Sequence, residues 1–252
     1  MTDAVGIQLS RVAIQYQTSE NKTLSSVNMV MPAGKWTSIL GKSGCGKTTM
    51  LRALAGLLEP GTVFHGDVLT SDGIPLSDRV AYMAQQDLLY PWLNVMENIC
   101  LSQRFGGKSA DYDRARMLLK AVGLDEVAES YPEQLSGGMR QRVALARTLM
   151  QDKPVVLMDE PFSAVDAVTR YQLQDLAVRL LKGKTILLVT HDPQEAARLA
   201  DAIYIFQGSP AYASPLAVPM SQTPRDIDVD AISLQQTILS MLGAKGGQYA
   251  GL

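Results

Sequence analysis

The sequence is poor in cysteine, in net charge and in long apolar runs. Its 252 residues include two cysteines, Cys45 and Cys100, too few for a framework of disulfide bonds, so we expect the reducing environment of the cytosol. The net charge is −2, which gives no sign of the basic surface that binds nucleic acid. No stretch approaches about 18 consecutive apolar residues, the length that spans a bilayer, and the first residues lack the pattern of a secretory signal. Any role at a membrane is therefore expected to depend on a partner.

The apolar content predicts a folded protein with a substantial core. Hydrophobic residues make up 46% of the chain and charged residues 19%, which is ordinary for a soluble globular protein. This length can hold one large domain or two small ones. Before residue 32, two alternating patterns predict half-buried strands, formed around Val12, Ile14 and Tyr16 and around Val27, Met29 and Met31.

Glycine is concentrated in one run, Gly41-Lys42-Ser43-Gly44-Cys45-Gly46-Lys47-Thr48-Thr49, which matches the pattern G-x-x-x-x-G-K-[ST]. Residues 35–40 before it are largely apolar and predict a buried strand. The residues after it have the apolar spacing of a helix face, at Leu51, Leu54, Ala55 and Leu58. A strand, a glycine-rich turn and a helix in this order indicate a phosphate-binding loop, and the alternative is a glycine-rich surface turn.

The expected chemistry of this loop follows from its residue types. Gly41, Gly44 and Gly46 have no side chain to keep the backbone away from an anion. The N–H groups at the start of the following helix attract phosphate. Lys47 is expected to reach the β- and γ-phosphates of a nucleotide, and the hydroxyl of Thr48 is expected to coordinate Mg²⁺.

Acidic and histidine side chains follow two other predicted strands. The apolar run at 155–158 ends in Asp159-Glu160, and two carboxylates in such a place are costly unless a cation or a reaction uses them. His191 follows a second buried pattern at 185–190. Because the carboxyl ends of parallel strands meet at one edge of a sheet, we expect Gly41, Asp159 and His191 to converge at a ligand site.

Three further features suggest roles at the same site, and two of them admit a second interpretation. Tyr16 can stack on an adenine ring or be an ordinary strand aromatic. Gln85 leaves a predicted strand and can lie beside the metal and the attacking water. Ser136-Gly137-Gly138 opens a helix within the predicted helical region 94–153, either as a second anion site or as plain helix capping.

Together these stretches resemble the ATP-binding subunit of an ABC transporter, over about residues 5–208. The glycine-rich run resembles the Walker A loop, and residues 155–160 resemble Walker B with its following glutamate. Gln85 is similar to the Q-loop glutamine of that family, and His191 is similar to its switch histidine. Residues 135–139 resemble the LSGGQ signature with Met139 in place of the usual glutamine, and residues 163–166 resemble the D-loop with valine in the usual leucine position.

The resemblance implies an α/β fold: a P-loop NTPase (RecA-like) core with a parallel sheet, an N-terminal antiparallel β subdomain and an inserted helical subdomain. The nucleotide-binding core would comprise residues 1–86 and 154–208. The helical signature subdomain would comprise residues 87–153, and a C-terminal tail with one helix would comprise residues 209–252.

The resemblance also implies a site shared by two copies of the chain, packed head to tail around two ATP molecules and Mg²⁺. Glu160 would be the general base, with His191 and Gln85 as further catalytic residues. Thr48, Gln85 and Asp159 would hold the metal. ATP would be bound by Tyr16, by Gly41 to Thr49 and by Asp166, and by the second copy's Ser136, Gly137 and Gly138.

The segment Tyr90-Pro91-Trp92-Leu93-Asn94-Val95 resembles bacterial importers of nitrate, sulphonates, taurine and pyrimidine thiamine precursors. The implied protein is an importer ATPase lying peripherally on the cytoplasmic face of the inner (plasma) membrane. Its partners would be integral-membrane permease subunits and, indirectly, a periplasmic solute-binding protein, with no nucleic acid. The alternatives are an exporter subunit, a non-transport ABC ATPase and a generic P-loop NTPase such as a small-molecule kinase. A kinase needs neither the Ser136–Gly138 turn nor His191.

Overall fold

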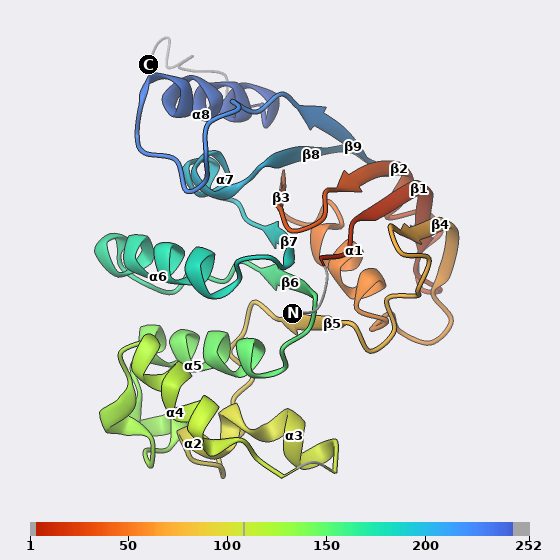
Figure 1. The fold of residues 1–252 in the computed structure, drawn as a ribbon. Helices are drawn as coiled ribbons and strands as arrows, with labels where there is room; N and C mark the ends of the chain where they lie inside the picture. Colours follow the sequence, from red (N-terminus) through yellow and green to blue (C-terminus); the bar gives the residue numbers. More distant parts are fainter. Residues whose placement is uncertain (1–3, 108, 244–252) are drawn as a thin grey trace, which may run out of the picture.

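The computed structural model describes residues 4–107 and 109–243, and the strands of this part form one nine-stranded sheet with helices around it (Figure 1). The spatial order of the strands is β4-β1-β2-β9-β8-β3-β7-β6-β5. In chain order they are β1 (Ile7–Gln15), β2 (Leu24–Met31), β3 (Trp36–Gly41), β4 (Val63–Thr70), β5 (Val80–Met83), β6 (Val155–Asp159), β7 (Thr185–Val189), β8 (Ala202–Gly208) and β9 (Ala211–Leu216). The predicted α/β fold is confirmed.

The α-helices fall into two groups. Four of them lie in the lower part of Figure 1, away from most of the sheet: α2 (Val95–Ile99), α3 (Leu101–Phe105), α4 (Tyr112–Ala121) and α5 (Gly137–Met150). The others lie beside the sheet: α1 (Lys47–Leu54), α6 (Ala167–Leu180), α7 (Pro193–Leu199) and α8 (Val229–Met241). Two short 3₁₀ helices, η1 (Asp125–Val127) and η2 (Pro132–Gln134), precede α5.

The half of the sheet that positions the site is parallel. β3 lies between β8 and β7, and β6 lies between β7 and β5. Every residue of β3, β6 and β7 is buried, because these strands are covered on both faces. For that reason they appear in the sequence as short continuous apolar runs.

The other end of the sheet is antiparallel, with β1 between β2 and β4. The register of β1 shifts between Leu9 and Val12, and Arg11 there has a positive φ of 53°. This irregularity lets Leu9 and Val12, three residues apart, both point into the core. Opposite it, a Cβ on Gly66 would lie 2.6 Å from the Arg11 carbonyl oxygen, so the close approach requires glycine.

Helices α2 to α5, called the helical group below, contribute buried residues of their own to the core. Ala115, Leu118, Leu119 and Val122 are buried on α4 and just after it, at the i, i+3, i+4, i+7 spacing of one helix face. Gly123 has a φ of 68° directly after the helix C-cap and ends the helix. α5 packs against α2, α4 and β5, and therefore joins this group to the sheet. The division at residues 87–153 stays a prediction.

The segment after Gly208 contains a strand and a helix. β9 pairs antiparallel with β8, and Pro215 is tolerated there because β9 meets its other neighbour β2 only at Ala211. α8 packs on α7 through buried residues that include Leu234 and Ile238. Residues 244–252 of the predicted tail lie outside the described residues.

Candidate active site

The glycine-rich loop connects β3 to α1 with the geometry that anion binding needs. Gly44 and Gly46 have φ angles of 77° and 98°, which other residues adopt only with strain. A Cβ on Gly41 would lie 2.7 Å from Cys45 Sγ and 2.8 Å from the Phe206 carbonyl oxygen, so this glycine is required by space. α1 begins at Lys47 with no acidic residue in its first turn, which leaves its positive end free to attract an anion.

Lys47 is buried beside this loop. Its Nζ donates hydrogen bonds to the carbonyl oxygens of Gly41 (2.9 Å) and Lys42 (3.0 Å). An ammonium group has three N–H donors, so the third can serve a phosphate oxygen. The side chain is held in place by the loop that it would assist.

Thr48 and Asp159 bring two oxygen atoms together. The Thr48 hydroxyl donates to Asp159 Oδ2 at 2.7 Å, across the gap between α1 and the end of β6. Asp159 is 2% exposed, and burial raises the pKa of its carboxyl, as does the negative charge of Glu160. A desolvated carboxylate beside a hydroxyl suits a hard cation such as Mg²⁺, which takes few protein ligands and keeps several waters.

Glu160 is the point on which the other polar side chains converge. Gln85 Nε2 donates to Glu160 Oε2 at 3.0 Å, and His191 Nδ1 lies 3.1 Å from the same oxygen. Gln85 follows β5, Glu160 follows β6 and His191 lies two residues past β7, so three adjacent parallel strands deliver them to one edge. The backbone of Glu160 has a φ of 49° and its N–H is bonded to the Val189 carbonyl oxygen at 2.8 Å. Strain of this kind is common where a side chain must be aimed.

These residues line one cavity of about 610 Å³. Among the residues that the sequence predicted for the site, those that line this cavity are Tyr16, Gly41, Ser43, Gly44, Gly46, Lys47, Thr48, Thr49, Gln85, Glu160 and His191. Thr23, which the sequence did not single out, lines it too. Tyr16 lies just beyond β1, and its hydroxyl is 3.1 Å from Thr49 Oγ1, so it lies against the start of α1. Stacking on adenine stays a prediction.

The remaining predicted residues do not line this cavity in a single chain. Ser136 caps α5 by accepting from Met139 N–H at 3.3 Å, and Asp166 caps α6 by accepting from Thr169 N–H at 3.0 Å. The two turns are close together, since a Cβ on Gly138 would lie 3.2 Å from Val165 Cγ1. Lys42 and Cys45 turn toward a separate small cavity beside Phe206 and the end of α8. Burial raises the pKa of the Cys45 thiol, which fits a filler rather than a nucleophile.

Two residues that support the site were missed in the sequence. Gln141 is buried on α5, and its Nε2 donates to the Pro161 carbonyl oxygen at 2.8 Å, directly after Glu160. Arg170 on α6 bridges Asp192 Oδ2 (3.1 Å) and the Val165 carbonyl oxygen (3.3 Å), and so ties the His191 turn to the 163–166 turn. Their partners are distant in sequence, and the available signal was a polar residue on a buried helix face.

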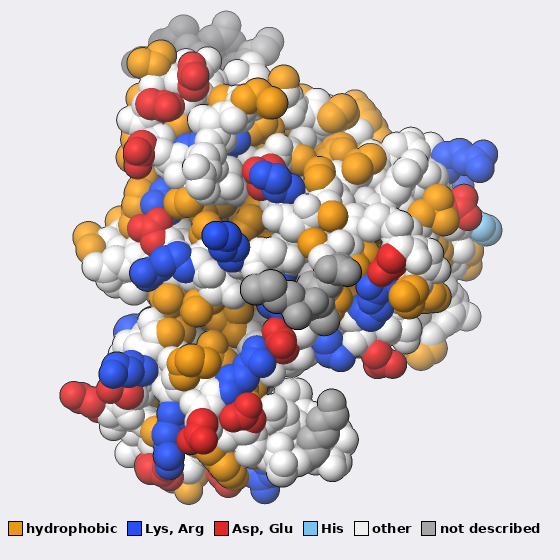
Figure 2. Space-filling view, viewed as in Figure 1, with side chains coloured by type: hydrophobic (Ala, Val, Ile, Leu, Met, Phe, Trp, Pro, Cys, Tyr) orange, Lys and Arg blue, Asp and Glu red, His pale blue; other side chains and the backbone are white. Residues whose placement is uncertain are grey.

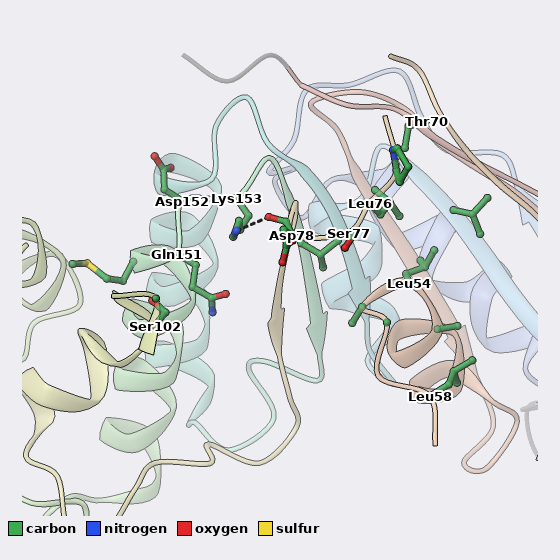
Figure 3. Close-up of a pocket in the computed structure, with 18 of the residues that line it drawn as sticks. Leu54, Leu58, Thr70, Leu76, Ser77, Asp78, Ser102, Gln151, Asp152 and Lys153 are labelled. Carbon is green, nitrogen blue, oxygen red and sulfur yellow. Dashed lines mark hydrogen bonds between the residues drawn. The ribbon is translucent and has the colours of Figure 1, made fainter. Parts of the chain in front are cut away.

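A second, larger cavity of about 1170 Å³ lies elsewhere. Figure 3 shows Leu54 and Leu58 on one side of it and Ser102 and Gln151 on the other, so its walls come from the sheet core and from the helical group. Leu58, expected on α1, lies past the helix end, because Gly56 turns the chain with a φ of 70°. Lys153 Nζ donates to the Asp78 carbonyl oxygen at its rim.

Comparison with known proteins settles the family. A family model described as ABC transporter matches residues 24–163, more than half of the chain. The chain belongs to the ABC transporter family. An uncharacterized ABC transporter ATP-binding protein of Haemophilus influenzae is 43% identical over 87% of this chain and 92% of its own length. An aliphatic sulfonates import ATP-binding protein, SsuB 2 of Agrobacterium fabrum, is 41% identical over 82% of this chain and 78% of its own length.

A solved structure of the same kind places this ABC protein among known cassettes. The dimeric post-hydrolysis state of the ATP-binding cassette MJ0796, bound to ADP and Pi, is 31% identical, with a TM-score of 0.74 over 85% of this chain and all of that one. The chain is thus an ABC-type ATPase with a P-loop NTPase core, as predicted. Within the described residues no helix of this ABC protein combines the length and apolarity needed to cross a bilayer. On the face seen in Figure 2, basic and acidic side chains are interspersed.

Proposed function

We propose that this chain is the ATP-hydrolysing subunit of an importer, which couples ATP binding and hydrolysis to the uptake of a small organic solute through a separate permease. The observation that carries the proposal is the meeting of Gln85 and His191 on one oxygen of Glu160, beside Lys47 and the Thr48–Asp159 pair. Relatives named for aliphatic sulfonate import favour a sulphonate, and a pyrimidine thiamine precursor or nitrate are the other candidates. An exporter subunit or a non-transport ABC ATPase is the alternative.

In this proposal the residues divide the work of phosphoryl transfer to water. Lys47 and the loop N–H groups bind the β- and γ-phosphates. Glu160 accepts the proton of the attacking water, Gln85 orients that water, and His191 donates toward the γ-phosphate oxygens. Thr48, Asp159 and Gln85 would hold Mg²⁺, which neutralises charge on the phosphates. Positioning and electrostatic stabilisation supply most of the rate in such reactions.

The complete site needs a second copy of the chain. Ser136, Gly137 and Gly138 line no part of the cavity that contains Lys47, yet they present a helix N-terminus, which is suited to phosphate. A head-to-tail pair brings this turn of one copy to the ATP held by the other. The dimeric MJ0796 cassettes support this arrangement. ATP then favours the closed pair, and hydrolysis releases it.

The permease would contact the helical group near Gln85. Leu88, Tyr90 and Trp92, just after Gln85, are exposed, and an exposed apolar cluster favours a protein partner. An occupant of the larger cavity (Figure 3) would touch both the core and the helical group, so closure of the pair would move it. The chain would therefore lie on the cytoplasmic face of the inner membrane, with a periplasmic solute-binding protein acting through the permease.

Glu160→Gln tests the proposal directly. The amide keeps the shape of the side chain but cannot accept the proton, so kcat should fall by about 100-fold or more, while ATP affinity stays within about threefold of wild type. Turnover and ATP binding are measured on the purified chain. Near wild-type hydrolysis by this variant would remove Glu160 from the proposed role.

A further inference from the structure

The segment that follows Gln85 is exposed on one side and anchored on the other. Leu88 is 57% exposed and Trp92 is 68% exposed, and the rings of Tyr90 and Trp92 lie 5.0 Å apart. We call residues 87–93 the exit segment. Leu88 has a φ of 48°, an unfavourable value for leucine, so neighbouring contacts must hold it there.

The far end of the exit segment is fixed by Asn98 on α2. This buried side chain accepts from Tyr90 N–H at 2.8 Å and donates to the carbonyl oxygens of Tyr90 (3.2 Å) and Leu93 (2.9 Å). It therefore fixes the part next to α2. The part next to Gln85 is held by a different residue.

The near end of the exit segment is fixed by Arg147 on α5. Its Nη1 donates to the Leu88 carbonyl oxygen at 2.7 Å, and its Nη2 donates to the Asp87 carbonyl oxygen at 2.5 Å. A planar guanidinium can bridge two consecutive carbonyls, which a lysine ammonium cannot do with the same rigidity. Burial lowers the pKa of the Arg147 guanidinium, and the negative charge of the nearby Asp87 opposes this shift.

Gln85 lies between this anchor and the sheet. It follows β5, which is paired with β6, and its side chain donates to Glu160 at 3.0 Å. Two residues further on, the backbone is bound to α5. Gln85 thus lies between the sheet on one side and the contacts of Asp87 with α5 on the other, where Arg147 binds the Asp87 backbone and Arg140 Nε lies 3.7 Å from its carboxylate.

We propose that Arg147 is a positioning residue for ATP hydrolysis: it binds the exit segment to α5 and thereby holds Gln85 against Glu160. The inference rests on the proposed role of Glu160. Since Ser136 caps the N-terminus of α5, the same bond links the exit segment to the helix whose N-terminus would meet the second copy's ATP. A movement of the exit segment would then displace both Gln85, beside Glu160, and the N-terminus of α5 at Ser136.

The test compares Arg147→Met with Arg142→Met on the same helix. Arg142 is also half-buried and donates to a backbone carbonyl, that of Val122 at 3.1 Å, but it binds the end of α4. Arg147→Met should lower kcat by about 10- to 100-fold, as expected for a catalytic group displaced by about 1 Å, with ATP affinity within about threefold. Arg142→Met should leave kcat within about twofold. Arg147→Lys, which can hold one carbonyl, should lie between Arg147→Met and wild type.

A second measurement reports on the exit segment itself. With Trp36 replaced by phenylalanine, Trp92 is the sole tryptophan of the chain. Its fluorescence anisotropy should fall in Arg147→Met and in Arg147→Lys, but not in Arg142→Met. A kcat for Arg147→Met equal to that of Arg142→Met, or a loss that lies wholly in ATP affinity, would overturn the proposal. Unchanged anisotropy of Trp92 in Arg147→Lys would also overturn the proposal. This variant replaces Arg147→Met in the test if the methionine variant does not fold. Failure of the proposed function can be told apart from failure of the Arg147 proposal, because it would appear as persistent ATP turnover in Glu160→Gln.

Discussion

At the scale of single residues, the side chains of the candidate site are already paired with one another in the single chain. Lys47 donates hydrogen bonds to two loop carbonyl oxygens. Thr48 donates one to Asp159, and Gln85 donates one to Glu160. Each pair holds a reactive group near the place where a phosphate, a cation or a water is needed, which lowers the cost of ordering it when ATP binds. The pairing also explains how so many charged and polar groups are tolerated near a buried sheet edge.

Lys47→Ala should weaken ATP binding by about 10- to 100-fold, because a hydrogen bond to a charged group contributes about 1.5–3 kcal/mol. The matched control is Lys182→Ala, since Lys182 is exposed and does not line the site cavity. Titration of both variants with an ATP analogue that is not hydrolysed separates binding from turnover. Equal affinity of Lys47→Ala and wild type would count against the phosphate-binding loop.

Glu195 on α7 gives the molecule a pH dependence outside the site cavity. Burial raises the pKa of its carboxyl to about 7 from an ordinary 4.5, and it accepts from Gln174 Nε2 at 3.1 Å. The folded state therefore favours the protonated form, and stability present below pH 4.5 is lost as the pH rises toward 7. Relative to Glu195→Gln, the wild type should lose about 3 kcal/mol of unfolding free energy between pH 4 and 8. Urea unfolding at several pH values measures this, and parallel profiles for the two proteins would contradict it.

At the scale of elements, α5 connects several parts of the candidate site. Ser136 is its N-cap, Gln141 contacts the loop after Glu160, and Arg147 holds the exit segment. The sequence indicated the helix and its N-terminus. Glycine, serine and buried-strand patterns are local signals, so the loop, the carboxylate pair and the parallel strands could be predicted. The contacts of Gln141 and Arg147 could not, because they join residues 20 and 59–60 positions apart.

β9 shows a second limit of local signals. Proline is typical of irregular segments, whereas this strand forms with Pro215 in it because β8 offers it a partner and little of its other edge needs N–H donors. Tertiary pairing overrode a local preference there. The convergence of Gly41, Asp159 and His191, at the ends of β3, β6 and β7, could be predicted because it follows from parallel topology.

Ser136 variants separate helix capping from anion binding. Ser136→Ala should lose about 1 kcal/mol of stability with the cap. Ser136→Asp should keep that stability, since aspartate is an equally good N-cap, but a carboxylate facing a triphosphate should abolish ATP-dependent pairing of the chains. Thermal unfolding and sedimentation velocity give the two readouts. An aspartate variant that pairs as well as wild type would reduce Ser136 to a cap.

At the scale of the whole molecule, two surfaces are suited to partners. The large cavity joins the core and the helical group, and the exposed residues of the exit segment follow Gln85 directly along the chain. In the proposed importer, this surface transmits closure to the permease, and solute recognition resides in other subunits. The purified chain is therefore expected to bind ATP but no sulphonate, nitrate or pyrimidine precursor.

The mass of the Glu160→Gln chain in solution with ATP shows directly whether the nucleotide is bound between two chains. We expect two chains per particle with ATP, one with ADP, and one with ATP when Ser136→Asp is added. A Glu160→Gln protein that stays monomeric with saturating ATP and a reconstituted permease, or a pair that Ser136→Asp leaves intact, would contradict a nucleotide bound between Lys47 of one chain and Ser136 of its partner.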